Sequence, residues 1–145
     1  MEIIIIHQPF HLVAHGLSGV AENKDYVGTA FKLADKLWQI IRANDVKNKG
    51  QNIWIYESGE SVFAGIELDA APLHDIGLEE KRIILEKYAY YKHIGSYKLI
   101  KQAGQQMQNE LKMKGLEIIS PYIEIYGHWM EDENKLETAL LMAIK

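Results

Sequence analysis

The chain has no cysteine among its 145 residues, only three prolines and only two arginines. The absence of cysteine excludes disulfides, thiolate metal sites and cysteine nucleophiles. With a formal net charge of −4 and so few arginines, a nucleic-acid-binding surface is not expected. No apolar run approaches the roughly 18 residues of a membrane span, and the first residues lack the basic segment of a signal peptide. We therefore expect a cytoplasmic protein that contacts neither membrane nor nucleic acid directly.

The rest of the composition is that of an ordinary globular domain. Apolar residues make up 48% of the chain and charged residues 25%. A chain of this length can bury one substantial hydrophobic core without disulfides. We expect a single domain over residues 1–145, with two similar halves at about 1–70 and 80–145.

The hydrophobic pattern alternates between strands and helices. Segments rich in β-branched and aromatic residues predict strands at residues 3–6, 10–13, 53–56, 62–68, 82–93, 121–126 and 137–144. Gly16 and Gly19 predict a loop after the segment 10–13. Apolar residues recur at helical spacing over 27–41 and again over 97–111, which predicts two amphipathic helices, with Ser96 placed to cap the second.

The predicted order is strand, helix, strand, strand, and the same order again. Ile53-Trp54-Ile55-Tyr56 and Ile123-Glu124-Ile125-Tyr126 align at an offset of 70 residues. The helical positions match at the same offset, with Ala30, Ala34, Leu37 and Ile41 falling on Ile100, Gly104, Met107 and Leu111. The expected fold class is α+β, an antiparallel sheet with both helices on one face and a central pocket on the other, twisted face. An α+β sandwich without internal symmetry is the alternative.

Four side chains, two on the second strand of each half, form a candidate binding site. Because side chains alternate across a strand, Glu124 and Tyr126 share one face, and Trp54 and Tyr56 take the equivalent positions in the first half. A twofold relation between the halves would bring all four to a common groove. A carboxylate among aromatic rings suits a cationic, largely aromatic ligand. The alternative is that Glu124 lies on an exposed sheet face beside surface tyrosines.

The segment Ser120-Pro121-Tyr122-Ile123-Glu124-Ile125-Tyr126 resembles the proline, glutamate and tyrosine signature of the GyrI-like small-molecule-binding domains. This family includes gyrase-inhibitory proteins and the effector domains of multidrug-responsive transcription regulators. Leu37-Trp38, the segment from Tyr91 to Tyr97 and a final strand reaching Ile144 also resemble it. The resemblance implies two strand-helix-strand-strand units around a pocket. It implies that Glu124 is the buried glutamate that contacts ligands. It also implies aromatic walls, for which the candidates are Trp38, Trp54, Tyr56, Tyr91 and Tyr126.

Three functions stay open from the sequence. Binding of amphipathic, cationic or aromatic small molecules is favoured, because binding places fewer demands on the exact positions of side chains than catalysis does. The second is hydrolysis of cyclopropane-containing electrophiles, which some stand-alone family members perform, with Glu124 as general base and Tyr126 steadying the leaving group. The third is an interaction with DNA gyrase through the outer surface. Many relatives carry a DNA-binding segment ahead of this domain, whereas this chain begins at its first strand, so we expect transcriptional control only through a separate regulator.

A row of histidines and a tryptophan near the last hairpin are two further features that could bear on function. His7, His11 and His15 recur every four residues, but four residues of extended chain span ~13 Å, too far for one zinc ion. We therefore expect no metal and no cofactor. His128-Trp129-Met130 falls where the last hairpin turns, and Trp129 there would either cover the pocket or cap the core.

Overall fold

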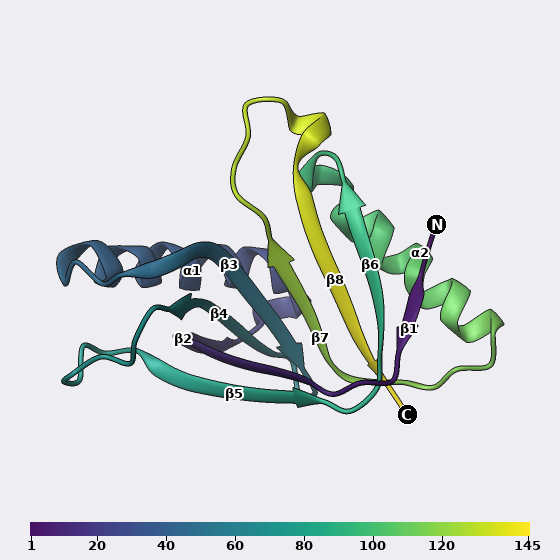
Figure 1. Ribbon diagram of the computed structural model, residues 1–145, viewed down its shortest axis with the longest axis horizontal. Helices are drawn as coiled ribbons and strands as arrows, with labels where there is room; N and C mark the ends of the chain where they lie inside the picture. Colours follow the sequence, from purple (N-terminus) through teal and green to yellow (C-terminus); the bar gives the residue numbers. More distant parts are fainter.

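One eight-stranded antiparallel sheet carries two helices in the computed structural model, which describes residues 1–145 (Figure 1). The order of strands across the sheet is β1-β6-β8-β7-β3-β4-β2-β5, and the sheet does not close. The strands are β1 (Ile4–Ile6), β2 (Phe10–Val20), β3 (Asn48–Glu57), β4 (Ser61–Leu68), β5 (Glu79–Leu85), β6 (Tyr88–Ile94), β7 (Ile118–Tyr126) and β8 (Glu137–Ile144). The helices are α1 (Tyr26–Ala43) and α2 (Ile100–Met113), with single 3-10 turns η1 (Glu22–Lys24), η2 (Tyr97–Leu99) and η3 (Glu133–Lys135).

The sheet consists of two four-stranded halves that meet where β3 pairs with β7. The units β2-α1-β3-β4 and β6-α2-β7-β8 have the same order of elements, so the predicted α+β fold with duplicated strand-helix-strand-strand units is confirmed. The short strand β1 pairs with β6, and the connecting strand β5 pairs with β2. Each half therefore receives its edge strand from a segment outside its own unit. The sequence predicted one strand over 82–93, where the structure has the separate strands β5 and β6.

The junction of the halves places Trp54 on β3 directly opposite Glu124 on β7. The flanking isoleucines pair in the same way, Ile53 with Ile125 and Ile55 with Ile123. The 70-residue offset exchanges these two isoleucine pairs, and it carries Trp54 onto Glu124 itself. Trp54 and Glu124 therefore lie at a local pseudo-twofold axis, where side chains from both halves converge.

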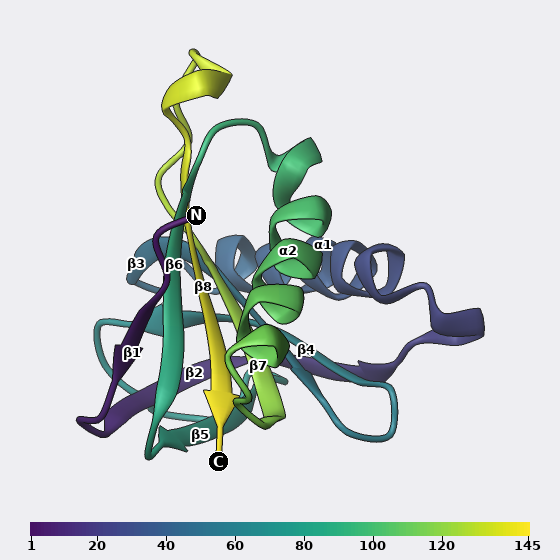
Figure 2. The ribbon, with the colours of Figure 1, turned by 90° about the vertical axis from the view of Figure 1, so that its right-hand side faces the viewer.

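Both helices lie on one face of the sheet, each over its own half (Figures 1 and 2). The Asp25 side chain accepts a hydrogen bond from the backbone N–H of Gly28 at 2.9 Å and so caps α1. Ser96 accepts from the N–H of Lys98 and opens the η2 turn that leads into α2, as its position predicted. The helix positions that match at the 70-residue offset are all buried: Ala30, Ala34, Leu37 and Ile41 in α1, and Ile100, Gly104, Met107 and Leu111 in α2. Neither helix combines the length and the apolar character that a bilayer crossing requires.

The face away from the helices is packed rather than hollow. The sheet bends between its halves, so that the strands of one half run across those of the other in Figure 1. Apolar side chains from both halves fill the inside of this bend; they include Leu12, Ile55, Phe63, Leu85, Ile123 and Leu141. The expectation of a pocket on this face is therefore not met. Strand alternation sends the isoleucines of β3 and β7 to this side, and it sends Trp54 and Glu124 to the side of the helices.

The strand β2 is longer than the sequence predicted, and the expected loop at Gly16 and Gly19 is wrong. β2 continues to Val20, pairing with β5 along its first part and with β4 along its second. Gly16 lies opposite Gly65, where the pairing of β2 with β5 ends and its pairing with β4 begins. A Cβ added to Gly16 would overlap the carbonyl oxygen of Ala64. Gly16 is thus required for the close approach of two strand backbones.

Replacing Gly16 by alanine should lower the free energy of unfolding by about 2–3 kcal/mol, because β2 and β4 would have to separate to admit the methyl group. Gly19→Ala is the matched control. The atoms nearest to its added Cβ are the methyl groups of Leu33 at 3.6 Å, an ordinary contact. Its unfolding free energy should change by less than about 1 kcal/mol. Urea unfolding of both variants measures the difference, and equal effects would contradict the close approach at Gly16.

Candidate functional site

A cavity of about 950 Å³ lies between the two helices, over the junction of β3 and β7. Its floor consists of side chains from these two strands, namely Asn52, Trp54, Tyr56, Tyr122, Glu124 and Tyr126. Its walls come from the start of α1 and from the η2–α2 segment. Exposed side chains such as Val27, Phe31 and Lys101 form its outer edge, so the cavity opens to solvent. The central pocket predicted from the sequence is therefore on the helix side of the sheet.

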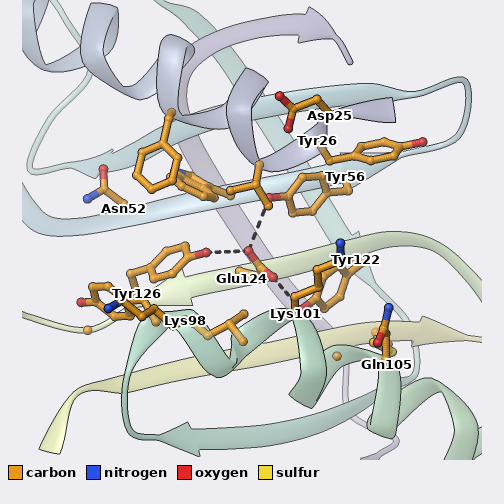
Figure 3. A pocket seen from close by; sticks show the side chains of 18 of the residues that line it. Asp25, Tyr26, Asn52, Tyr56, Lys98, Lys101, Gln105, Tyr122, Glu124 and Tyr126 are labelled. Carbon is orange, nitrogen blue, oxygen red and sulfur yellow. Dashed lines mark hydrogen bonds between the residues drawn. The ribbon is translucent and has the colours of Figure 1, made fainter. Parts of the chain in front are cut away.

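Glu124 lies at the centre of this floor and is only 7% exposed (Figure 3). Three tyrosine hydroxyls donate to it: Tyr126 to Oε1 at 2.6 Å, Tyr122 to Oε2 at 2.8 Å and Tyr56 to Oε1 at 3.4 Å. Each of the six ion pairs in the structure joins other residues, so no lysine or arginine neutralises Glu124. The carboxylate thus receives hydrogen bonds from phenols and forms no ion pair.

Burial raises the pKa of Glu124, while the hydrogen bonds from the three tyrosines act in the opposite direction. Burial, followed by the nearby carboxylate, raises the pKa of Tyr56, Tyr122 and Tyr126. These phenols therefore keep their protons across the pH range in which Glu124 titrates, and they remain hydrogen-bond donors. Glu124 is the group in the cavity floor that can exchange a proton or receive a cation.

Aromatic rings surround the carboxylate in two series of contacts. On one side, edge-to-face contacts link Phe31 to Trp54, Trp54 to Tyr126 and Tyr126 to Tyr97, with ring centroids 5.0, 4.8 and 5.3 Å apart. On the other side, Tyr26 meets Tyr56 edge-on at 6.0 Å, and Tyr56 stacks on Tyr122 at 5.8 Å. Such contacts fix ring orientation. The aromatic surfaces around Glu124 are therefore largely preorganised before any ligand arrives.

Of the six residues predicted to bind a ligand, the structure brings four to the cavity: Trp54, Tyr56, Glu124 and Tyr126. Trp38 does not line it. The Trp38 indole N–H donates to Oδ1 of Asn52 at 2.7 Å, and its ring packs with a separate cluster beside Leu37. Tyr91 also lies outside the cavity, packed against the core beneath α2. No three histidine or acidic side chains are grouped in a way that would hold a metal ion.

Several cavity residues were missed from the sequence. Tyr122 is two residues before Glu124, so the alternation that placed Tyr126 on the same face also applied to it. Phe31 falls within the apolar spacing that predicts the helix over 27–41, but it is 57% exposed and forms part of the wall. Trp129 lies at the edge of the cavity and is 72% exposed, in the β7–β8 connection that projects beyond the sheet in Figure 2. At this exposure Trp129 does not cap the core, and its place at the cavity edge agrees with the alternative that it covers the cavity.

No protein-family model and no curated protein matches the chain, but solved structures share its fold. A structure of SAV2435 bound to tetraphenylphosphonium matches with a TM-score of 0.67 and 18% identity, over 100% of this chain and 94% of that one. The C-terminal domain of EcmrR matches with a TM-score of 0.71 and 12% identity, over 99% and 96%. A hydrolase from Listeria innocua matches with a TM-score of 0.53 and 10% identity, over 96% and 92%. At these identities the likeness shows a common fold, which is consistent with the GyrI-like family that the sequence resembles.

The raised pKa of Glu124 predicts a pH-dependent contribution to stability. Because the folded state holds this proton more tightly than the unfolded chain, the contribution is fully present below the unfolded pKa of about 4.3. It is lost as the pH rises through the folded pKa. Glu124→Gln removes the titration, so the Tm of this variant minus that of the wild type should increase from pH 4 to pH 7. Thermal unfolding over this range measures it, and a difference that stays constant with pH would contradict the raised pKa.

Proposed function

We propose that this protein binds small amphipathic molecules, cationic and aromatic in character, in the cavity between α1 and α2. The observation that carries the proposal is the buried carboxylate of Glu124, which is hydrogen-bonded by tyrosines but has no cationic partner. An ionised carboxylate in such a place gains most from a cation that comes with its own apolar surface, because the cation then loses little hydration on entry. The rings around Glu124 add cation–π attraction and apolar contact.

The size of the cavity supports a ligand with several rings. Its volume of about 950 Å³ is at the upper end of the range for small-molecule pockets, roughly 300–1,000 Å³. Trp54 and Phe31 offer apolar area on one side of the carboxylate, and Tyr56 and Tyr122 offer stacked rings on the other. SAV2435, which shares the fold, was solved with tetraphenylphosphonium, a cation with four aromatic rings. That ligand is a suitable first probe for this chain.

Hydrolysis is the second candidate, and the raised pKa of Glu124 favours it because a general base works best with a pKa near the operating pH. The match to a hydrolase from Listeria innocua supports it only through the shared fold. However, both carboxylate oxygens already accept hydrogen bonds from tyrosines. Oε1 accepts two of these hydrogen bonds and Oε2 accepts one, which leaves a single acceptor position on Oε2 for a water, whereas attraction of a cation depends on the charge of the carboxylate and needs no free lone pair. No feature of the structure favours the interaction with gyrase, which stays an expectation from the family resemblance.

Glu124→Gln should weaken the binding of tetraphenylphosphonium by about 10-fold or more, because the amide keeps the shape of the side chain but removes the charge that meets the cation. Isothermal titration calorimetry at pH 7 measures the affinity, and quenching of Trp54 and Trp129 fluorescence provides a second readout. Glu57→Gln is the matched control. Glu57 also lines the cavity, but its carboxylate is already paired with Lys81, so this variant should bind like the wild type.

Equal affinity of the wild type and Glu124→Gln for the cation would contradict the proposed role of the carboxylate. Incubation with a cyclopropane-bearing electrophile, followed by mass spectrometry, separates binding from catalysis. Recovery of the unchanged compound supports binding alone. A hydrated, ring-opened product formed by the wild type and not by Glu124→Gln would establish hydrolysis instead.

A further inference from the structure

The two helices present different chemistry to the cavity. Helix α1 itself contributes the apolar and aromatic residues Tyr26, Val27 and Phe31, and the turn before it contributes Lys24 and Asp25. The η2–α2 segment contributes Tyr97 and Ile100, together with four amide or amine side chains, Lys98, Lys101, Gln105 and Gln108. The three residues at 101, 105 and 108 follow helical spacing and belong to one continuous face of α2. Most of the amide and amine side chains in the wall therefore lie on the α2 side of the cavity.

The residues that line the cavity carry charges of both signs. The lining contains three lysines, Lys24, Lys98 and Lys101, and three acids, Asp25, Glu57 and Glu124. Two of the acids have partners within the protein, because Asp25 caps α1 and Glu57 pairs with Lys81. Lys98 and Lys101 form no ion pair, and Figure 3 shows them on the α2 side of the cavity, one to each side of Glu124. Lys24, in the turn before α1, is also unpaired, so two of the three unpaired lysines lie on the α2 side, while the Glu124 carboxylate lies in the floor.

The position of the two lysines is electrostatically unfavourable without a partner. They occupy the η2 turn and the first turn of α2, which contains no acidic residue. Positive charge is disfavoured at this end of a helix, because the backbone dipoles make it partly positive. Lysines three residues apart on a helical turn also repel each other. A negative group held beside Lys98 and Lys101 would relieve both effects.

A site for a simple cation would not be expected to carry these lysines, because they repel a positive ligand. Lys98 and Lys101 reduce the affinity of a purely cationic ligand for Glu124 at every ionic strength where they are unscreened. The arrangement instead matches a molecule that carries both signs of charge. Its cationic aromatic part would meet Glu124 and the rings, and its anionic part would lie against α2.

We propose that Lys98 and Lys101 form an anion-binding subsite, and that the cavity selects amphoteric ligands, aromatic cations that also carry a carboxylate. This inference rests on the proposed function, because Glu124 must hold the cationic part for the subsite to be reached in a fixed orientation. It narrows the ligand class from lipophilic cations in general to those that carry an anionic substituent.

Two probes that differ by one group test the subsite. Tetraphenylphosphonium carries a single positive charge, and (4-carboxyphenyl)triphenylphosphonium has the same body with an added carboxylate. The wild type should bind the carboxylated probe at least about threefold more tightly, the gain expected for an ion pair near the surface. This preference should shrink as salt is added. In the double variant Lys98→Gln/Lys101→Gln the preference should disappear, and tetraphenylphosphonium itself should bind at least as tightly as to the wild type.

Lys112→Gln is the matched control, since Lys112 lies in the last turn of the same helix and does not line the cavity. It should keep the wild-type preference. If the wild type binds tetraphenylphosphonium through Glu124 but shows no preference for the carboxylated probe, or if the double variant keeps the preference, the subsite is overturned and the proposed function stands. If the wild type binds neither probe, the proposed function itself fails, and the subsite fails with it.

Discussion

The burial of the Glu124 carboxylate at the junction of the two halves is the constraint on which the rest of the site depends. Removing an ionised carboxylate from water costs on the order of several kcal/mol unless other groups replace its hydration. Tyr56 comes from the first half, and Tyr122 and Tyr126 come from the second. The pseudo-twofold relation of the halves allows this, because it places Glu124 opposite Trp54 and lets both second strands contribute to one floor. The three tyrosine hydroxyls replace hydrogen bonds that the carboxylate loses on leaving water, but they do not neutralise its charge.

The same junction explains why a cavity forms above Glu124. Helix α1 packs on β2 and β4, and helix α2 packs on β6 and β7, so each helix covers its own half. The central part of the sheet between them is covered by side chains from the starts of both helices, which leave a cavity open to solvent. On the opposite face, the bend of the sheet brings the isoleucines of β3 and β7 together with apolar side chains of both halves. Alternation along β3 and β7 thus produces an apolar core on one side of the sheet and a charged cavity on the other.

Much of this arrangement could be predicted from the sequence, because it depends on local periodicity. The 70-residue offset correctly paired the buried positions of the helices, and the alternation along β3 and β7 identified Trp54, Tyr56, Glu124 and Tyr126 as sharing a face. Features that depend on how elements meet in space could not be predicted. Gly16 signals a loop by its residue type, but its role is the close approach to β4. The side of the sheet on which the cavity lies depends on the bend of the sheet, which no local pattern specifies.

The errors in the site have the same origin. Trp38 lies on the helix that borders the cavity, yet its position along α1 places its ring in a neighbouring cluster, where its indole N–H donates to Asn52 of the cavity floor. Tyr91 faces the helix side of the sheet but is covered by α2. Lys98 and Lys101 look like ordinary surface lysines in the sequence, because their relation to Glu124 exists only once α2 is docked on the sheet.

The most direct test of the central claim is an NMR titration of the Glu124 side-chain carboxyl carbon in ¹³C-labelled protein, with and without tetraphenylphosphonium. If Glu124 is a buried carboxylate that meets a cation, its pKa in the free protein should lie above the ordinary value for glutamate, and saturation with the cation should lower it. An unchanged pKa in the presence of bound cation would show that the ligand does not meet Glu124. That result would contradict the proposed site.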